Sequence, residues 1–114
     1  MIIVVAKISF NSQADRDRAC TESAPIQQAT RDEEPGCHEY CFAPDPCVPD
    51  TIQVYELWED SDSLAAHFNH PNYHAMVKLL MEIGLVESIS RAYLTERDES
   101  VYGDNGEMKT AFFQ

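Results

Sequence analysis

The fold of this chain is decided by residues 55–67, YELWEDSDSLAAH. This stretch ends an alternating β-rich segment, passes through an acidic turn and continues with apolar residues at helical spacing. Because side chains alternate along a strand, Glu56 and Trp58 are expected on one face among aliphatic neighbours. The turn at residues 60–62 offers oxygens that can cap a helix, and His67 follows in that helix. We therefore expect Glu56, Trp58 and His67 to line one cavity between a sheet and its covering helix.

Each of these three residues has two interpretations. A carboxylate is costly to bury without a hydrogen-bond partner, so Glu56 is either a paired structural carboxylate or the group that orients His67. Trp58 is a core residue, a flat wall for an aromatic ligand, or both. His67 is either a helical histidine satisfied by a backbone or carboxylate partner, or a general base.

The other residues predict an α+β chain in the ferredoxin-like order β-α-β-β-α-β. A helix is expected from Asn11 or Ser12 to about Arg31, with a thin apolar face and with Pro25 kinking or splitting it. His38 and Tyr40 are expected opposite Cys37 and Cys41 on a strand, facing either the pocket or a protomer interface. The predicted strands are residues 1–10, 37–43, 51–59 and 86–95, and the later helices are residues 63–69 and 71–83.

Three sequence segments resemble the antibiotic biosynthesis monooxygenase family of dimeric α+β barrels. The first is residues 55–67, with Glu-x-Trp followed by Leu-x-x-His. The second, residues 34–40 (EPGCHEY), is similar to the start of the second strand in bacterial quinol monooxygenases, and the third, residues 70–74 (HPNYH), resembles the family's proline-containing helix joint. The resemblance covers residues 1–97 as one domain and leaves residues 98–114 as a C-terminal tail.

The resemblance implies a homodimer in which two sheets pack face to face, because a four-stranded sheet with helices on one face leaves the other face bare. The tail ends in aromatic residues, Phe112 and Phe113. We expect it either to dock on its own protomer or to reach across to the partner.

The resemblance also implies a reaction: oxygenation of a quinol-like or phenolic aromatic by dioxygen, without metal, flavin or haem. The deprotonated substrate itself supplies the electron, so the protein needs an apolar pocket, a base and oxyanion donors. The expected catalytic residues are His67 as base, Trp58 as pocket wall and Glu56. The expected substrate-binding residues are Asn72, Tyr40, His38, Leu64 and Met76. The alternative is a small-molecule binding or stress-associated protein of the same fold, or an isomerase, that does not oxygenate.

Composition and sequence spacing argue against several other kinds of partner and site. A net charge of −12 argues against nucleic acid or an anionic membrane as partner. No segment has the length of a membrane span or the features of a signal peptide, so we expect a cytoplasmic protein with four free thiols. His67, His70 and His74 have helical spacing, but Pro71 interrupts it, so no metal site is expected.

Overall fold

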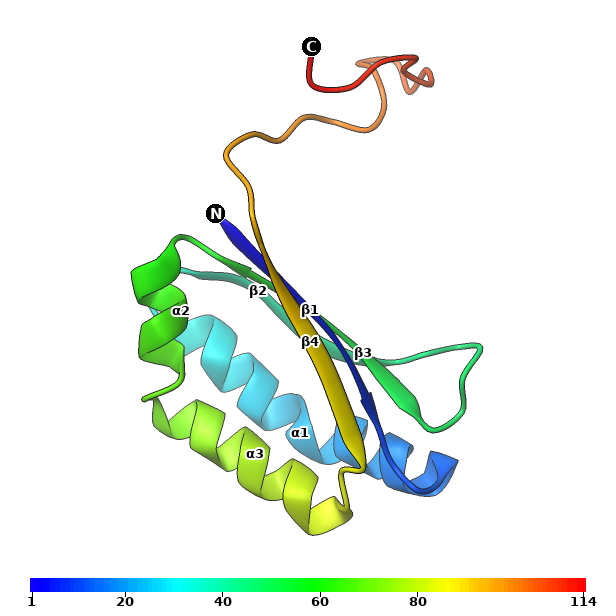
Figure 1. Cartoon of the computed structure of the whole chain (residues 1–114), viewed down its shortest axis with the longest axis vertical. Helices are drawn as coiled ribbons and strands as arrows, with labels where there is room; N and C mark the ends of the chain where they lie inside the picture. Colours follow the sequence, from blue (N-terminus) through cyan, green and yellow to red (C-terminus); the bar gives the residue numbers. More distant parts are fainter.

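The computed structural model describes all residues, 1–114, and confirms the predicted order of elements (Figure 1). Those elements are β1 (Ile2–Ser9), α1 (Gln13–Glu33), β2 (Cys37–Pro44), β3 (Thr51–Trp58), α2 (Ser61–His67), α3 (Pro71–Ile83) and β4 (Glu87–Leu94). The second helical region is divided at Pro71, which begins α3, as the sequence predicts.

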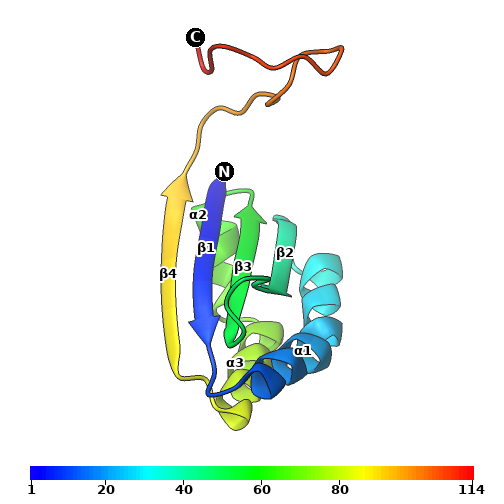
Figure 2. The same cartoon turned by 90° about the vertical axis from the view of Figure 1, so that its right-hand side faces the viewer.

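The four strands form one antiparallel sheet in the order β2-β3-β1-β4. The apolar strand β1 is central, between β3 and β4. All three helices lie on one face of the sheet, here called the inner face (Figure 2). Ile52, Val54, Glu56 and Trp58 are all buried, which confirms that they share this face.

Helix α1 is longer than predicted and Pro25 does not split it. Its N-cap is Ser12, whose hydroxyl accepts a hydrogen bond from the Asp15 backbone N–H at 3.1 Å. The thin apolar face expected for this helix is only partly buried: Ala19 is buried and Ile26 packs against the core, whereas Ala14 and Ala24 are exposed. The buried side chains of α1 are Arg16, Ala19, Ser23, Gln27 and Thr30.

The polar residues of that buried face all have hydrogen-bond partners, which explains how the helix packs without an apolar stripe. Arg16 donates to the carbonyl oxygens of Asp45 and Thr51, at 3.2 and 3.1 Å, and so fixes the loop before β3. Gln27 accepts from the Phe42 backbone N–H at 2.9 Å and ties α1 to β2.

A β-bulge between Cys37 and Glu39 shifts the register of β2 against β3. Tyr40 pairs with Glu56 on the inner face, and Cys37 pairs with Trp58. The expected common face for Cys37 and Cys41 is therefore wrong, because the extra residue breaks the alternation. Cys37 packs against the core, whereas Cys41 pairs with Tyr55.

The sheet face opposite the helices, here called the outer face, is bare (Figure 2). Its exposed apolar side chains are Val5, Tyr55, Ile89 and Tyr93. Beyond β4 the tail projects past the end of the sheet (Figures 1 and 2), which explains a radius of gyration of 16.0 Å against about 13 Å for a compact chain of this length. None of the helices is both long and apolar enough to cross a membrane.

Phe113, in the tail, lies by a hollow at one end of the outer face, beside Ile3, Tyr55 and Leu57. The guanidinium of Arg97 lies 5.7 Å from the centre of the Phe113 ring. Phe112 and Phe113 stay about half exposed, at 48% and 51%. The contacts of the tail with the rest of the chain are therefore partial and leave aromatic surface exposed.

Candidate functional site

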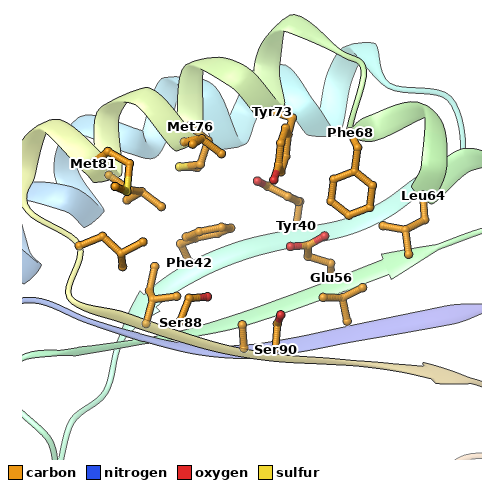
Figure 3. Close-up of a pocket in the computed structure, with 16 residues that line it drawn as sticks. Tyr40, Phe42, Glu56, Leu64, Phe68, Tyr73, Met76, Met81, Ser88 and Ser90 are labelled. Carbon is orange, nitrogen blue, oxygen red and sulfur yellow. The ribbon is translucent and has the colours of Figure 1, made fainter.

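A cavity of about 350 Å³ lies between the inner face of the sheet and helices α2 and α3 (Figure 3). Its size is at the lower end of the range for small-molecule sites, roughly 300–1,000 Å³. Most of the wall is apolar, and the polar lining groups are Glu56, Ser88, Ser90 and the hydroxyls of Tyr40 and Tyr73. The apolar wall consists of Val4, Ala6, Ile8, Phe42, Leu64, Phe68, Met76, Val77, Leu80, Met81 and Leu85.

Glu56 is the ionisable carboxylate of this cavity. It is 8% exposed, and its Oε1 accepts a hydrogen bond from Trp58 Nε1 at 2.9 Å. Oε2 has no partner in the chain, yet no buried side-chain oxygen is left unsatisfied, so this oxygen is open to the cavity. Burial raises the pKa of Glu56 to about 7, with a smaller increase from Glu34, while the Trp58 hydrogen bond opposes the shift. A carboxyl group with this pKa can accept or return a proton at neutral pH.

Tyr40 is the cross-strand neighbour of Glu56 and is 2% exposed. Burial, and then the negative charge of Glu56, raises the pKa of Tyr40 far above its usual value. Its hydroxyl therefore stays protonated and has no acceptor within the chain. The cavity wall thus includes both a proton acceptor, Glu56, and a hydrogen-bond donor, Tyr40 (Figure 3).

His67 lies behind this cavity wall and not on it. Its Nδ1 is 2.6 Å from Glu34 Oε1, and both side chains are 3% exposed. The ring is enclosed by other rings, with centroid distances of 4.7 Å to Trp58, 5.3 Å to Tyr73 and 5.4 Å to Tyr40. The interpretation of Glu56 as the group that orients His67 is therefore wrong, because Glu34 occupies that position.

The fold and the matched sequence agree on a family. Residues 1–79 match the antibiotic biosynthesis monooxygenase family. The chain belongs to this family.

Solved structures of low identity share the fold of this family member. A proposed antibiotic biosynthesis monooxygenase from Deinococcus radiodurans superposes with a TM-score of 0.79 at 22% identity, covering 90% of this chain and 100% of that one. Rv0793 from Mycobacterium tuberculosis gives 0.72 at 16% identity, covering 87% and 98%. SnoaB, a cofactor-independent oxygenase from Streptomyces nogalater, gives 0.64 at 12% identity, covering 85% and 94%. No curated protein matches the sequence.

In this antibiotic biosynthesis monooxygenase domain, four predicted site residues line the cavity: Glu56, Tyr40, Leu64 and Met76. Trp58 does not line the cavity, but it donates a hydrogen bond to Glu56, which does. Asn72 lies in the network behind His67, where its Nδ2 donates to Glu34 Oε2 at 3.2 Å. His38 is at the surface and pairs with Glu59, because the bulge turns it away from the inner face.

Four polar residues of the site were not predicted from the sequence, namely Glu34, Tyr73 and the two serines of β4. Glu34 is 33 residues from His67, so no local spacing indicates their pairing. Ser88 and Ser90 could have been found, because they alternate on the last strand and therefore share a face.

No group of three histidine, cysteine, aspartate or glutamate side chains is arranged to hold a metal ion. Of the three helical histidines, only His67 is fully buried, whereas His70 caps α3 by accepting from the Asn72 backbone N–H at 3.1 Å and His74 is exposed. All four cysteines are free thiols.

Proposed function

We propose that this protein is a cofactor-independent monooxygenase that oxidises a small quinol-like or phenolic aromatic with dioxygen. The observation that carries the proposal is Glu56, whose Oε1 is bonded to Trp58 and whose Oε2 is left for a ligand, in the wall of an apolar cavity that Tyr40 also lines. Such a cavity can hold a flat ring, and its one carboxylate can take the proton of a ring hydroxyl. The description of SnoaB as a cofactor-independent oxygenase supports the reaction class on this fold.

The reaction starts with proton transfer from the substrate hydroxyl to ionised Glu56. Tyr40 donates a hydrogen bond to the resulting phenolate oxygen, which stabilises the charge as it forms. The phenolate gives one electron to dioxygen, and the two radicals join in a carbon–oxygen bond at a ring carbon that carries hydrogen. Protonated Glu56 returns its proton to the peroxide anion and then, again ionised, takes the proton of the ring C–H bond. As that bond and the O–O bond break, the carbonyl of the quinone forms, and the leaving hydroxide takes the proton from Glu56 and departs as water. One substrate and one dioxygen therefore give one quinone and one water.

Glu56 is favoured over His67 as the proton acceptor. His67 is enclosed by aromatic rings and bonded to Glu34, whereas Glu56 reaches the cavity. In this proposal, Trp58 holds the carboxylate through Nε1, while His67 and Asn72 position the wall behind it. His67 as the base remains the rival assignment, which requires Tyr40 and Trp58 to move aside.

Oxygen uptake by metal-free protein with a panel of quinols and naphthols tests this function. Glu56→Gln keeps an acceptor for Trp58 but no base, so turnover should fall by about two to four orders of magnitude. Glu59→Gln, an exposed glutamate beyond β3, is the matched control and should keep wild-type turnover.

His67→Ala separates the two assignments, because it should leave most turnover if Glu56 is the base. Loss of turnover in His67→Ala with activity retained in Glu56→Gln would reverse the assignment. Wild-type protein that binds these aromatics but consumes no oxygen would favour the binding protein or isomerase of the same fold.

The proposal includes a homodimer formed by the outer faces. Val5 and Tyr55 are exposed there without a helix to cover them, and burying such a face in a second copy removes apolar surface from water.

Val5→Asp would place an unpaired charge in that interface and should dissociate or unfold the protein. Sedimentation equilibrium measures the oligomeric state. Val48→Asp, in an exposed loop, is the control and should leave it unchanged. A folded monomer of the wild-type protein at micromolar concentration contradicts the dimer.

A further inference from the structure

The polar groups of the cavity are not all at one end. Glu56 and Tyr40 come from β3 and β2, whereas Ser88 and Ser90 come from β4 at the opposite edge of the sheet. Figure 3 shows Glu56 pointing toward the helices and the two serines on the β4 side of the floor. Both serines are exposed at the open side of the cavity, and their hydroxyls make no hydrogen bond within the chain, so they can bind a ligand in place of water.

The floor between these two ends is apolar. Strand β1 lies between β3 and β4, and contributes Val4, Ala6 and Ile8 to the cavity. Glu56 is aligned with Val4, and Ser90 is aligned with Ala6, two residues along the strand. Neighbouring strands are about 4.8 Å apart and residues rise about 3.4 Å along a strand, so the backbones that carry Glu56 and Ser90 are separated by roughly 10 Å across β1 and roughly 7 Å along it, or about 12 Å in all.

A ligand that satisfies both ends must therefore be flat and apolar in the middle, with an oxygen at each end. We propose that Ser88 and Ser90 form a second polar subsite, which selects fused two-ring aromatics with oxygens at opposite ends over aromatics with a single hydroxyl. One hydroxyl binds Glu56 and Tyr40, the ring lies over Ala6, and the distal oxygen binds the β4 serines. The inference rests on the proposed function for the reaction, but its substrate selection is a binding property.

Calorimetric titration without oxygen tests selection apart from turnover. The probes are 2,6-naphthalenediol and 2-naphthol, which share the ring system and differ in the distal hydroxyl. Wild-type protein should bind the diol on the order of fivefold to tenfold more tightly, the contribution of about one hydrogen bond. The double variant S88A/S90A should lose this preference while binding 2-naphthol as the wild type does, which also shows that the cavity is intact.

Ser9→Ala is the matched control, because Ser9 is a strand serine of β1 outside the cavity lining. It should bind both probes as the wild type does. Equal wild-type affinity for the two probes, an equal loss of both in the double variant, or no binding of either probe overturns the subsite. A serine-dependent preference for the diol without oxygen uptake supports the subsite and contradicts the monooxygenase.

Discussion

Glu34 and Glu56 are both buried carboxylates beside an aromatic nitrogen, but their surroundings differ. Glu34 Oε1 meets His67 at 2.6 Å and its Oε2 accepts from Asn72 at 3.2 Å, so both oxygens have partners. Glu56 has one partner, Trp58, and one oxygen that faces the cavity. A carboxylate with both oxygens bonded holds the structure together, whereas one with a free oxygen keeps capacity for a ligand.

The two carboxylates also join different parts of the fold. Glu34 follows α1 and connects it to the end of α2 and the start of α3, so it fixes the helices that roof the cavity. Glu56 lies within β3 and is supported from the same strand by Trp58. Glu34 with His67 and Asn72, here called the closed site, therefore holds the helices that cover the cavity, whereas Glu56 with Trp58, here called the open site, places a carboxylate in the cavity wall.

The largest effect on stability is expected from Trp58→Ala, which removes a fully buried indole and the donor to Glu56. The cost should be roughly 3–5 kcal/mol in the free energy of unfolding, as for other large aromatic core residues. Chemical denaturation measures it. Before mutation, a blue tryptophan emission that shifts on binding of naphthols is expected, and a red, freely quenched emission would show that the indole faces water.

The second largest loss of stability is expected when the closed site around Glu34 is broken. Glu34→Ala leaves the buried His67 and Asn72 without their acceptor and should cost about 3 kcal/mol, the lower end of the range for breaking a buried pair. Asp32→Ala, an exposed acidic residue in the last turn of α1, is the control. Similar midpoints of urea unfolding for the two variants would show that the network adds nothing.

At the open site, removing the carboxylate should raise the stability of the protein, the opposite of the effect at Glu34. Because the pKa of Glu56 is raised to about 7, its contribution to stability is complete below pH 4.5 and is lost as pH rises through 7. Glu56→Gln should therefore be more stable than wild type at pH 8, by at most roughly 3 kcal/mol, and the difference should disappear at pH 4. Thermal unfolding of both proteins across this range checks it; a constant difference would mean that Glu56 has an ordinary pKa.

The smallest expected effect is on the pH profile of turnover. If ionised Glu56 accepts the substrate proton, turnover should fall about tenfold for each pH unit below 7 and level off above it. Initial rates of oxygen uptake from pH 5 to 9 provide the test. A profile that is flat through pH 7 would argue for a base other than Glu56.

The strands and the open site could be predicted from sequence because a period of two is local. That period placed Glu56 and Trp58 on one face with Ile52 and Val54. The closed site could not be predicted, since Glu34 and His67 come together only through packing across 33 residues. The bulge at Cys37/Glu39 changed which residues of β2 face inward, and nothing in the local pattern marks the extra residue.

The buried face of α1 also escaped prediction, because hydrophobicity alone does not identify a polar side chain that will find a partner. Gln27 bonds to Phe42 of β2, a contact that forms only when the chain folds, and Thr30 is buried with its hydroxyl bonded to the Ile26 carbonyl of its own helix. Sequence periodicity therefore identified the helix but not the face that packs.

The proton on Glu56 has a thermochemical consequence. Between about pH 4.5 and 7 the folded protein holds this proton while the unfolded chain does not, so unfolding releases up to one proton to the buffer. The heat absorbed on melting at pH 6 will then depend on the ionisation enthalpy of the buffer chosen. Comparing phosphate with a buffer of high ionisation enthalpy would count that proton directly, and the count should vanish in Glu56→Gln.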